Sequence, residues 1–194
     1  LLQALNRDFE GHEDVLKLCA EAPKYGNDDA RADDLAADLF TFIADEIENY
    51  SSKFGKMTPG ILPVSGNTPF GLEVGALPSG RRAWKPLADG VSPNGGTDCN
   101  GPSAVLKSVA NIPHDRFVQG TLLNMKIDPE MLETENGITQ LMALLKSLCS
   151  LGVYHVQFNV VDQAKLLEAQ KNPEKYKGLL VRVAGYTAFF VELG

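Results

Sequence analysis

Residues 179–194 read LLVRVAGYTAFFVELG, an apolar run interrupted by one internal glycine, Gly185. The β-branched and aromatic residues on both sides favour a pair of buried strands. A glycine within such a pattern usually marks a bulge, a turn or a close approach of two backbones. Glycine also permits a chemical use, because loss of its α-hydrogen leaves a carbon radical that the flanking amide groups stabilise and that no Cβ prevents from becoming planar. Taken alone, the run leaves both explanations open.

The run Arg182-Val183-Ala184-Gly185-Tyr186 and its continuation through FVEL resemble the signature of the glycyl radical enzymes. Further runs upstream also resemble this family, and together they cover nearly the whole chain. They are GALPSGRR at residues 75–82, PLADGVSP at 86–93, NGPSAVLKS at 100–108 and QFNVV at 157–161. The chain is therefore identified as a member of this family, and the chemical explanation of Gly185 is preferred.

The resemblance implies that Gly185 stores the radical and that no cofactor is bound to the chain itself. A separate activating enzyme, an iron-sulfur protein that uses S-adenosylmethionine, is implied as the partner that removes the hydrogen. The neighbouring residues would then serve recognition by this partner and the geometry of the loop. Arg182 would be a charged handle, unless it only forms a surface ion pair, and Val183, Ala184 and Tyr186 would provide packing.

The family also implies a catalytic cysteine on a second loop, followed two residues on by a glutamate. Cys19 and Cys149 lie in helical patterns and are predicted to be small buried hydrophobes. Cys99 lies in a loop, but its surroundings do not resemble the family's cysteine loop. We therefore expect the catalytic cysteine and glutamate to lie upstream of this chain, which we interpret as a C-terminal portion that is incomplete at both ends.

The composition is that of a globular chain with an acidic first part. Its 194 residues, 44% of them hydrophobic, suffice for one domain or two small ones. Residues 1–50 contain 13 acidic and 4 basic residues, which argues against nucleic acid as a partner and indicates a solvated outer face. No apolar run approaches the ~18 residues of a membrane span, so no membrane partner is expected. The 3 cysteines show no metal-ligand spacing, which predicts neither disulfides nor a metal site and favours the reducing cytoplasm.

Strand and helix patterns alternate in the second half, so the predicted fold class is α/β. Two short helices are expected in residues 1–22, then a long helix capped within Asn27-Asp28-Asp29. A packed irregular path with short strands is expected over residues 55–101. The later elements are a helix at 102–110, a strand at 119–127, a helix at 137–151 capped by Asn136, a strand at 154–161 and a helix that begins after Asp162.

The resemblance divides the chain into two parts of a β/α barrel enzyme. Residues 1–95 would be the end of the pyruvate formate-lyase-like barrel domain, and residues 96–194 the glycine radical domain, incomplete at its C-terminus. The resemblance further implies that the loop at residues 66–71 approaches the substrate, so Asn67, Thr68 and Phe70 are candidates to line the pocket. A tight turn built from Gly, Asn and Pro explains the same residues and is preferred. His155, on the predicted strand, is expected to satisfy a backbone or core polar group.

The resemblance implies a lyase that eliminates across C–O, C–N or C–S bonds of a small molecule, as diol and glycerol dehydratases, choline trimethylamine-lyase, hydroxyproline dehydratase and isethionate lyase do. One alternative is formate C-acetyltransferase (pyruvate formate-lyase) activity. Another is a stand-alone spare-part protein that restores the radical of a damaged enzyme, and a third is a binding module with an accidental motif. The expected partners are the activating enzyme, the upstream barrel portion of the same protein, the substrate and a second copy in a homodimer.

Overall fold

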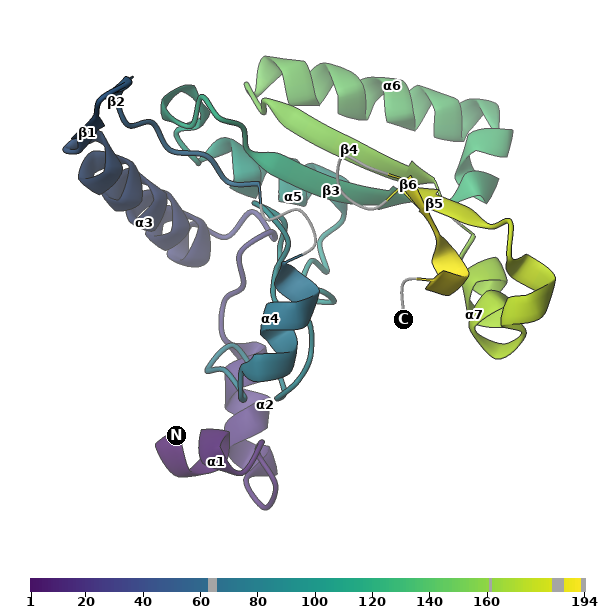
Figure 1. Ribbon diagram of the computed structural model, residues 1–194. Helices are drawn as coiled ribbons and strands as arrows, with labels where there is room; N and C mark the ends of the chain where they lie inside the picture. The colour runs from purple at the N-terminus through teal and green to yellow at the C-terminus, as the bar shows by residue number, and fades with distance from the viewer. Residues whose placement is uncertain (63–65, 161, 183–186, 193–194) are drawn as a thin grey trace.

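A computed structural model describes residues 1–62, 66–160, 162–182 and 187–192 (Figure 1). The helices are α1 (Leu2–Asn6), α2 (Glu13–Glu21), α3 (Ala30–Glu48), α4 (Asn67–Glu73), α5 (Pro102–Ala110), α6 (Glu135–Ser150) and α7 (Gln163–Lys171). The strands are β1 (Ser51–Ser52), β2 (Gly55–Lys56), β3 (Leu122–Ile127), β4 (His155–Val160), β5 (Leu180–Arg182) and β6 (Thr187–Phe189). The mixture of helices and strands is as expected, but the described strands form 2-stranded sheets rather than a barrel.

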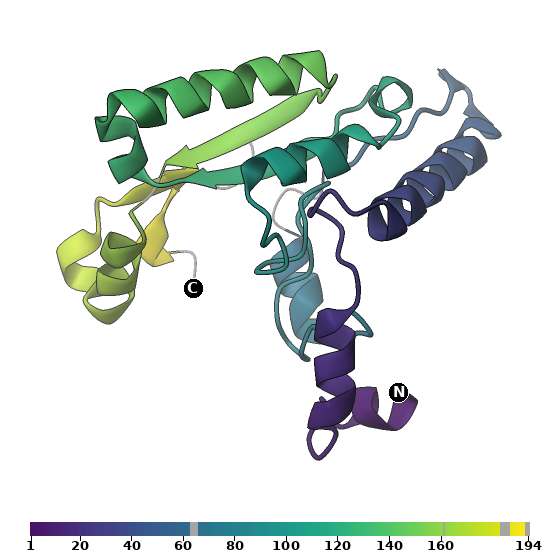
Figure 2. The same ribbon diagram turned by 180° about the vertical axis from the view of Figure 1, so that it is seen from behind.

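The centre of the fold is the parallel pair β3 and β4, joined by the crossover helix α6. Leu122 pairs with His155 and Ile127 with Val160. In both views α6 covers one face of this pair, and α5 lies beside β3 (Figures 1 and 2). Leu106 of α5, Leu123 of β3 and Phe117 between them are almost completely buried, and each such side chain contributes about 1.5–3 kcal/mol through its burial.

The helix α6 begins earlier than the sequence predicted. Its N-cap is Thr134, whose hydroxyl accepts from the Gly137 backbone N–H at 3.0 Å. The expectation of Asn136 as the cap was wrong, because the backbone is still extended at Thr134 and Asn136 already lies in the helix. The apolar side chains of α6 are only partly covered: Leu144 and Leu148 pack against the core, whereas Met142 is 53% exposed.

The long helix α3 starts where the sequence predicted. Asp29 is its N-cap and accepts from the Arg31 backbone N–H at 3.1 Å. Its inner side packs on the core through Ala44, which is fully buried, and through Phe40, whose ring meets Phe117 edge to face at 5.9 Å. These contacts place α3 on the side of the molecule away from β5 and β6 (Figures 1 and 2).

The irregular segment contains a helix where a tight turn was preferred. Residues 67–73 form α4, so that preference was wrong. Pro69 lies in the first turn, where its missing N–H costs no hydrogen bond. Gly71 is buried against the backbone at Lys85, since a Cβ built on Gly71 would lie 2.3 Å from the Lys85 carbonyl oxygen. Tertiary contact therefore holds a glycine- and proline-containing segment in a helix.

The C-terminal end of α4 is held by a buried arginine. Arg81 is 6% exposed, and its guanidinium donates to the carbonyls of Gly71 at 2.9 Å, Gly75 at 2.9 Å and Lys85. The last carbonyls of a helix lack partners within the helix, and a cation is favoured there by the helix dipole. Arg81 thus ties α4 to the loop that follows it.

We predict that Arg81→Met lowers the free energy of unfolding by about 2 kcal/mol or more, because several buried carbonyls lose a charged donor. Arg82→Met is the matched control. Arg82 is exposed and contacts Asp8 at 3.7 Å, so its replacement costs about 1 kcal/mol or less. Denaturant unfolding of the intact protein measures both, and equal losses in the two variants would contradict the assigned role of Arg81.

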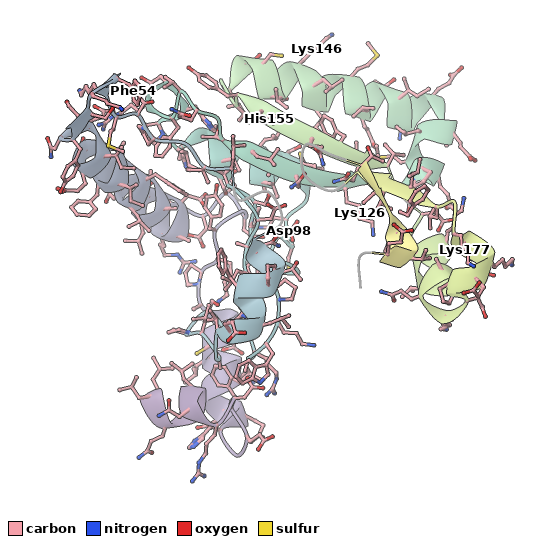
Figure 3. The ribbon with its side chains drawn as sticks, viewed as in Figure 1. Phe54, Asp98, Lys126, Lys146, His155 and Lys177 are labelled. Atoms are coloured by element: carbon pink, nitrogen blue, oxygen red, sulfur yellow. The ribbon has the colours of Figure 1, made fainter. Side chains whose placement is uncertain are left out.

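The histidine that satisfies core polar groups is His114 rather than His155. His114 is 4% exposed; its Nε2–H donates to the Val109 carbonyl at 2.9 Å, and its Nδ1 accepts from the Thr121 hydroxyl at 2.7 Å. Burial lowers the pKa of His114 below its ordinary value. His155 begins β4 with an exposed side chain (Figure 3), so the expectation for it was wrong.

We predict that His114 makes the free energy of unfolding depend on pH. Because its pKa is lowered in the fold, the unfolded chain binds a proton first, and the free energy of unfolding decreases as pH falls below about 6.5. Above that range the neutral ring is intact and the contribution is complete. Unfolding measured from pH 7.5 to 5 tests this: His114→Gln should flatten the slope of the free energy of unfolding against pH, while the same slope in the variant and in the unaltered protein would refute it.

Candidate functional site

The strands β5 and β6 form an antiparallel hairpin that brackets the predicted radical position. Leu180 pairs with Phe189 and Arg182 pairs with Thr187, and the Phe190 N–H donates to the Leu179 carbonyl at 2.8 Å. The strand pair predicted from the sequence is therefore confirmed. The connecting residues, which are Val183, Ala184, Gly185 and Tyr186, lie outside the described residues, as does the side chain of Arg182.

The hairpin is anchored by the helix that precedes it. The 3₁₀ turn at Phe190–Glu192 packs against α7. The α7 helix is capped, as predicted, by Asp162, whose carboxylate accepts from the Ala164 N–H at 2.8 Å and the Lys165 N–H at 3.2 Å. Ala169 on this helix is completely buried. The region from α7 to the 3₁₀ turn thus forms one local unit around the hairpin.

This hairpin lies at the carboxyl ends of β3 and β4, which both views show (Figures 1 and 2). Carboxyl ends of parallel strands are the common location of functional groups in open α/β sheets. The hairpin is only partly covered, because Leu180 is 56% and Phe189 is 41% exposed. Apolar strand residues with this exposure leave a surface on which further protein can pack.

The face of β3 and β4 turned away from α6 is polar. Asn124 pairs with Gln157 and Lys126 with Asn159, and residues two apart on a strand share a face. Lys126 extends from β3 on the side away from α6, whereas Lys146 points outward from α6 (Figure 3). The pair of strands therefore presents apolar residues to α5 and α6 and amides to the other side.

On the polar face, Asp89 is joined to β3. The Asn124 side-chain amide donates to the Asp89 carboxylate, and the Asn124 backbone N–H donates to the Ser92 hydroxyl at 3.0 Å. Burial raises the pKa of Asp89, partly offset by the Asn124 hydrogen bond. Among the described residues, the Oδ1 atoms of Asp89, Asn124 and Asn159 are buried without a hydrogen-bond partner. This face is therefore rich in hydrogen-bond acceptors.

These acceptor residues were not singled out from the sequence. Asp89 lies within the PLADGVSP run and Asn159 within QFNVV, but Asn124 belongs to none of the quoted runs. A pair such as Asp89 and Asn124 is separated by 35 residues, so no local pattern predicts it. The sequence marked Asp89 and Asn159 only as members of the PLADGVSP and QFNVV runs.

A cleft of ≈ 700 Å³ opens between the end of α2 and the segment that follows α4. Its charged lining includes Lys24, Arg81, Lys85 and Asp89. Arg81 and Lys24 both donate to backbone carbonyls, and the Arg81 side chain is buried. The volume lies within the usual range for small-molecule sites.

The candidate pocket residues do not all reach this cleft. Asn67 lines it and is tied to the opposite wall, because the Leu87 N–H donates to the Asn67 carbonyl at 3.0 Å. Thr68 and Phe70 lie on the exposed side of α4, and Phe70 is 67% exposed. A role of these three residues in substrate binding stays a prediction.

The cysteines do not form a catalytic pair with a glutamate on a loop. Cys19 is followed at the family spacing by Glu21, but both lie in α2, and the Glu21 carboxylate is exposed and 3.7 Å from the Lys17 ammonium. Cys149 is exposed on α6, so its expected burial was wrong. Cys99 is exposed in a loop that Asn27 holds by accepting from the Cys99 N–H at 2.8 Å.

Within the described ranges, no group of three or more His, Cys, Asp or Glu side chains is placed to hold a metal ion. None of the helices in that part of the chain is both long enough and apolar enough to cross a membrane.

The sequence matches two family models in consecutive parts. The glycine radical family model matches residues 87–191, which includes Gly185, and the pyruvate formate lyase-like model matches residues 1–71. Among curated proteins, the chain is 41% identical over 198 residues to isethionate sulfite-lyase of Nitratidesulfovibrio vulgaris, covering all of this chain and 24% of the relative. It is 42% identical over 195 residues to trans-4-hydroxy-L-proline dehydratase of Clostridioides difficile, covering all of this chain and 25% of the relative.

Solved structures agree with these matches. The B12-independent glycerol dehydratase of Clostridium butyricum superposes with a TM-score of 0.92 at 44% identity, over 99% of this chain and 25% of that one. Hydroxyproline dehydratase of Clostridioides difficile superposes with a TM-score of 0.94 at 41% identity, over 100% and 25%. The chain thus spans about a quarter of the length of these relatives. Because the glycine radical family model matches residues 87–191 and these solved structures superpose on the chain, the chain belongs to the glycine radical family.

Proposed function

We propose that this chain is the radical-bearing part of a glycyl radical enzyme and that Gly185 stores the radical. The observation that carries the proposal is the hairpin: β5 ends at Arg182, β6 begins at Thr187, and these two residues pair. In the sequence, Gly185 falls between these two paired strands. The match of the glycine radical model to residues 87–191 supports the same assignment.

In the proposed reaction the radical passes from Gly185 to a cysteine of the intact protein, whose thiyl removes a hydrogen atom from a substrate carbon. The group on the neighbouring carbon then leaves with its bonding electron pair and takes up a proton given up by the substrate radical, so the unpaired electron stays on the product. The product radical takes the hydrogen atom back from the thiol, which regenerates the thiyl. Each turnover thus eliminates one group without consuming the radical.

The substrate class we propose is a small molecule with a C–O, C–N or C–S bond next to the carbon that loses hydrogen. The relatives support this class, since they include a sulfite-lyase, a hydroxyproline dehydratase and a (2S)-3-sulfopropanediol dehydratase, the last at 35% identity. The family also contains a 4-hydroxyphenylacetate decarboxylase glycyl radical subunit at 38% identity. Asn67, Thr68 and Phe70 remain our candidates for contact with the substrate.

The intact protein would supply what the described residues lack. We propose that residues 1–95 complete a pyruvate formate-lyase-like β/α barrel domain and that residues 96–194 form the radical domain. A barrel wall over the exposed Leu180 and Phe189 would keep water from the radical. The match of residues 1–71 to the pyruvate formate lyase-like model favours this arrangement over a stand-alone spare part, which has no need of that segment.

An activating enzyme that uses S-adenosylmethionine and an iron-sulfur cluster would install the radical. In this proposal Arg182 helps the activating enzyme to recognise the hairpin, and Val183, Ala184 and Tyr186 set the geometry around Gly185. We further propose that the protein forms a homodimer. We also propose a cytoplasmic location, because the free thiols Cys19, Cys99 and Cys149 suit a reducing compartment.

Radical formation tests the assignment directly. Full-length protein treated anaerobically with the activating enzyme and S-adenosylmethionine should give an organic-radical EPR signal, and Gly185→Ala should abolish it. Protein grown with α-deuterated glycine provides the control, since the doublet from the remaining α-hydrogen should collapse to a narrower line. A signal that persists in Gly185→Ala would contradict the proposal.

A further inference from the structure

The helix α3 is apolar over a wider arc than a surface helix requires. At about 100° per residue, Phe42, Leu35, Leu39 and Ile43 span an arc of roughly 100°. A second arc of about 80° adjoins it and contains Ala36, Phe40 and Ala44, of which Phe40 and Ala44 pack on the core. A surface helix needs an apolar stripe of about 100°, and a wider one is typical of helices buried from more than one side.

The first arc, which we call the outer face of α3, is uncovered. Leu35 is 70%, Leu39 is 56% and Phe42 is 59% exposed. Figure 1 shows α3 as an arm beside the β3–β4 layer, with its far end continuing into β1 and β2. At the tip of that hairpin Phe54 is 89% exposed (Figure 3). Contiguous apolar surface of this kind marks an interaction site.

We propose that the outer face of α3 packs permanently against the remainder of the same polypeptide, on a complementary apolar surface. This inference rests on the proposed function, in which the chain is part of a longer enzyme. The relatives are about four times as long as the matched part, since the chain covers 24% or 25% of them. Moreover, α3 lies in the part matched by the pyruvate formate lyase-like model rather than in the glycine radical part.

Two other occupants fit less well. The activating enzyme must reach Gly185, and α3 lies on the opposite side of the molecule from β5 and β6 in both views (Figures 1 and 2). A transient partner would also leave the outer face in water between encounters. A second copy would bring together two segments with 13 acidic and 4 basic residues each in residues 1–50, and like charges oppose association.

The experiment measures thiol labelling in the full-length protein. Leu39→Cys and, as the matched control, Asp34→Cys are treated with N-ethylmaleimide, and peptide mass spectrometry separates the introduced position from Cys19, Cys99 and Cys149. Asp34 is exposed on the same helix, about 140° around its axis from Leu39. We expect the thiol at position 39 to react about tenfold or more slowly than the thiol at position 34, at every protein concentration.

Each other outcome overturns the proposal. Equal rates mean that the outer face is free. Protection that disappears on dilution to the monomer assigns the face to a second copy, and protection that appears only with the activating enzyme assigns it to that protein. A native polypeptide with the mass of this chain, 21.0 kDa, would also refute it.

A second measurement needs no substitution and removes the risk that a variant fails to fold. Hydroxyl-radical footprinting of the unaltered full-length protein should show Phe42 protected, and a reactive Phe42 would refute the proposal. Neither readout depends on Gly185. A protein with protected positions but no EPR signal would support the interface and refute the proposed function. A protein with the EPR signal but reactive positions on α3 would support the proposed function and refute the interface.

Discussion

The parallel pairing of β3 with β4 is the constraint on which the rest of the structure depends. The register from Leu122 with His155 to Ile127 with Val160 gives the pair one apolar and one polar face. A slip of one residue would exchange these faces. The apolar face receives α5 and α6, and the carboxyl ends of the two strands lie at the hairpin of β5 and β6 (Figure 1). The position of the β5–β6 hairpin thus depends on one strand register.

The same strand organises the irregular segment. The Val91 N–H donates to the Leu122 carbonyl at 2.9 Å, and a Cβ on Gly90 would lie 2.1 Å from that carbonyl oxygen. Only glycine allows this close approach, and Gly90 also has a positive φ of 58°. Asp89 and Ser92 on either side bond to Asn124. The PLADGVSP run is therefore a backbone crossing on β3, which accounts for its composition in physical terms.

Several apolar side chains outside the core remain exposed. The core around Leu106 and Leu123 is fully buried, whereas Leu39 on α3, Met142 on α6 and Leu180 on β5 remain 56%, 53% and 56% exposed. These residues lie on faces turned away from the core. A chain that belongs to a larger protein is expected to show apolar faces of this kind, because its surface is shaped for contacts with the rest of the protein.

Much of the fold follows from local patterns in the sequence. The cap at Asp29, the proline start of α5, the alternation in β4 and the cap at Asp162 were all predictable, because the physical causes lie within a few residues of one another. The glycine motif and the upstream runs likewise identified the family from the sequence. The role of Gly185 stays a prediction, since it lies outside the described residues.

Tertiary structure alone decided the remaining features, because their causes join residues far apart in the chain. Residues 67–73 form a helix rather than a turn, as Gly71 packs on Lys85 and Arg81 holds the helix end. His114 rather than His155 is buried, since Thr121 and Val109 provide its partners. The contact of Asp89 with Asn124 spans 35 residues. Local sequence determines which elements form and where they begin, whereas burial and long-range hydrogen bonds decide which of their faces are used.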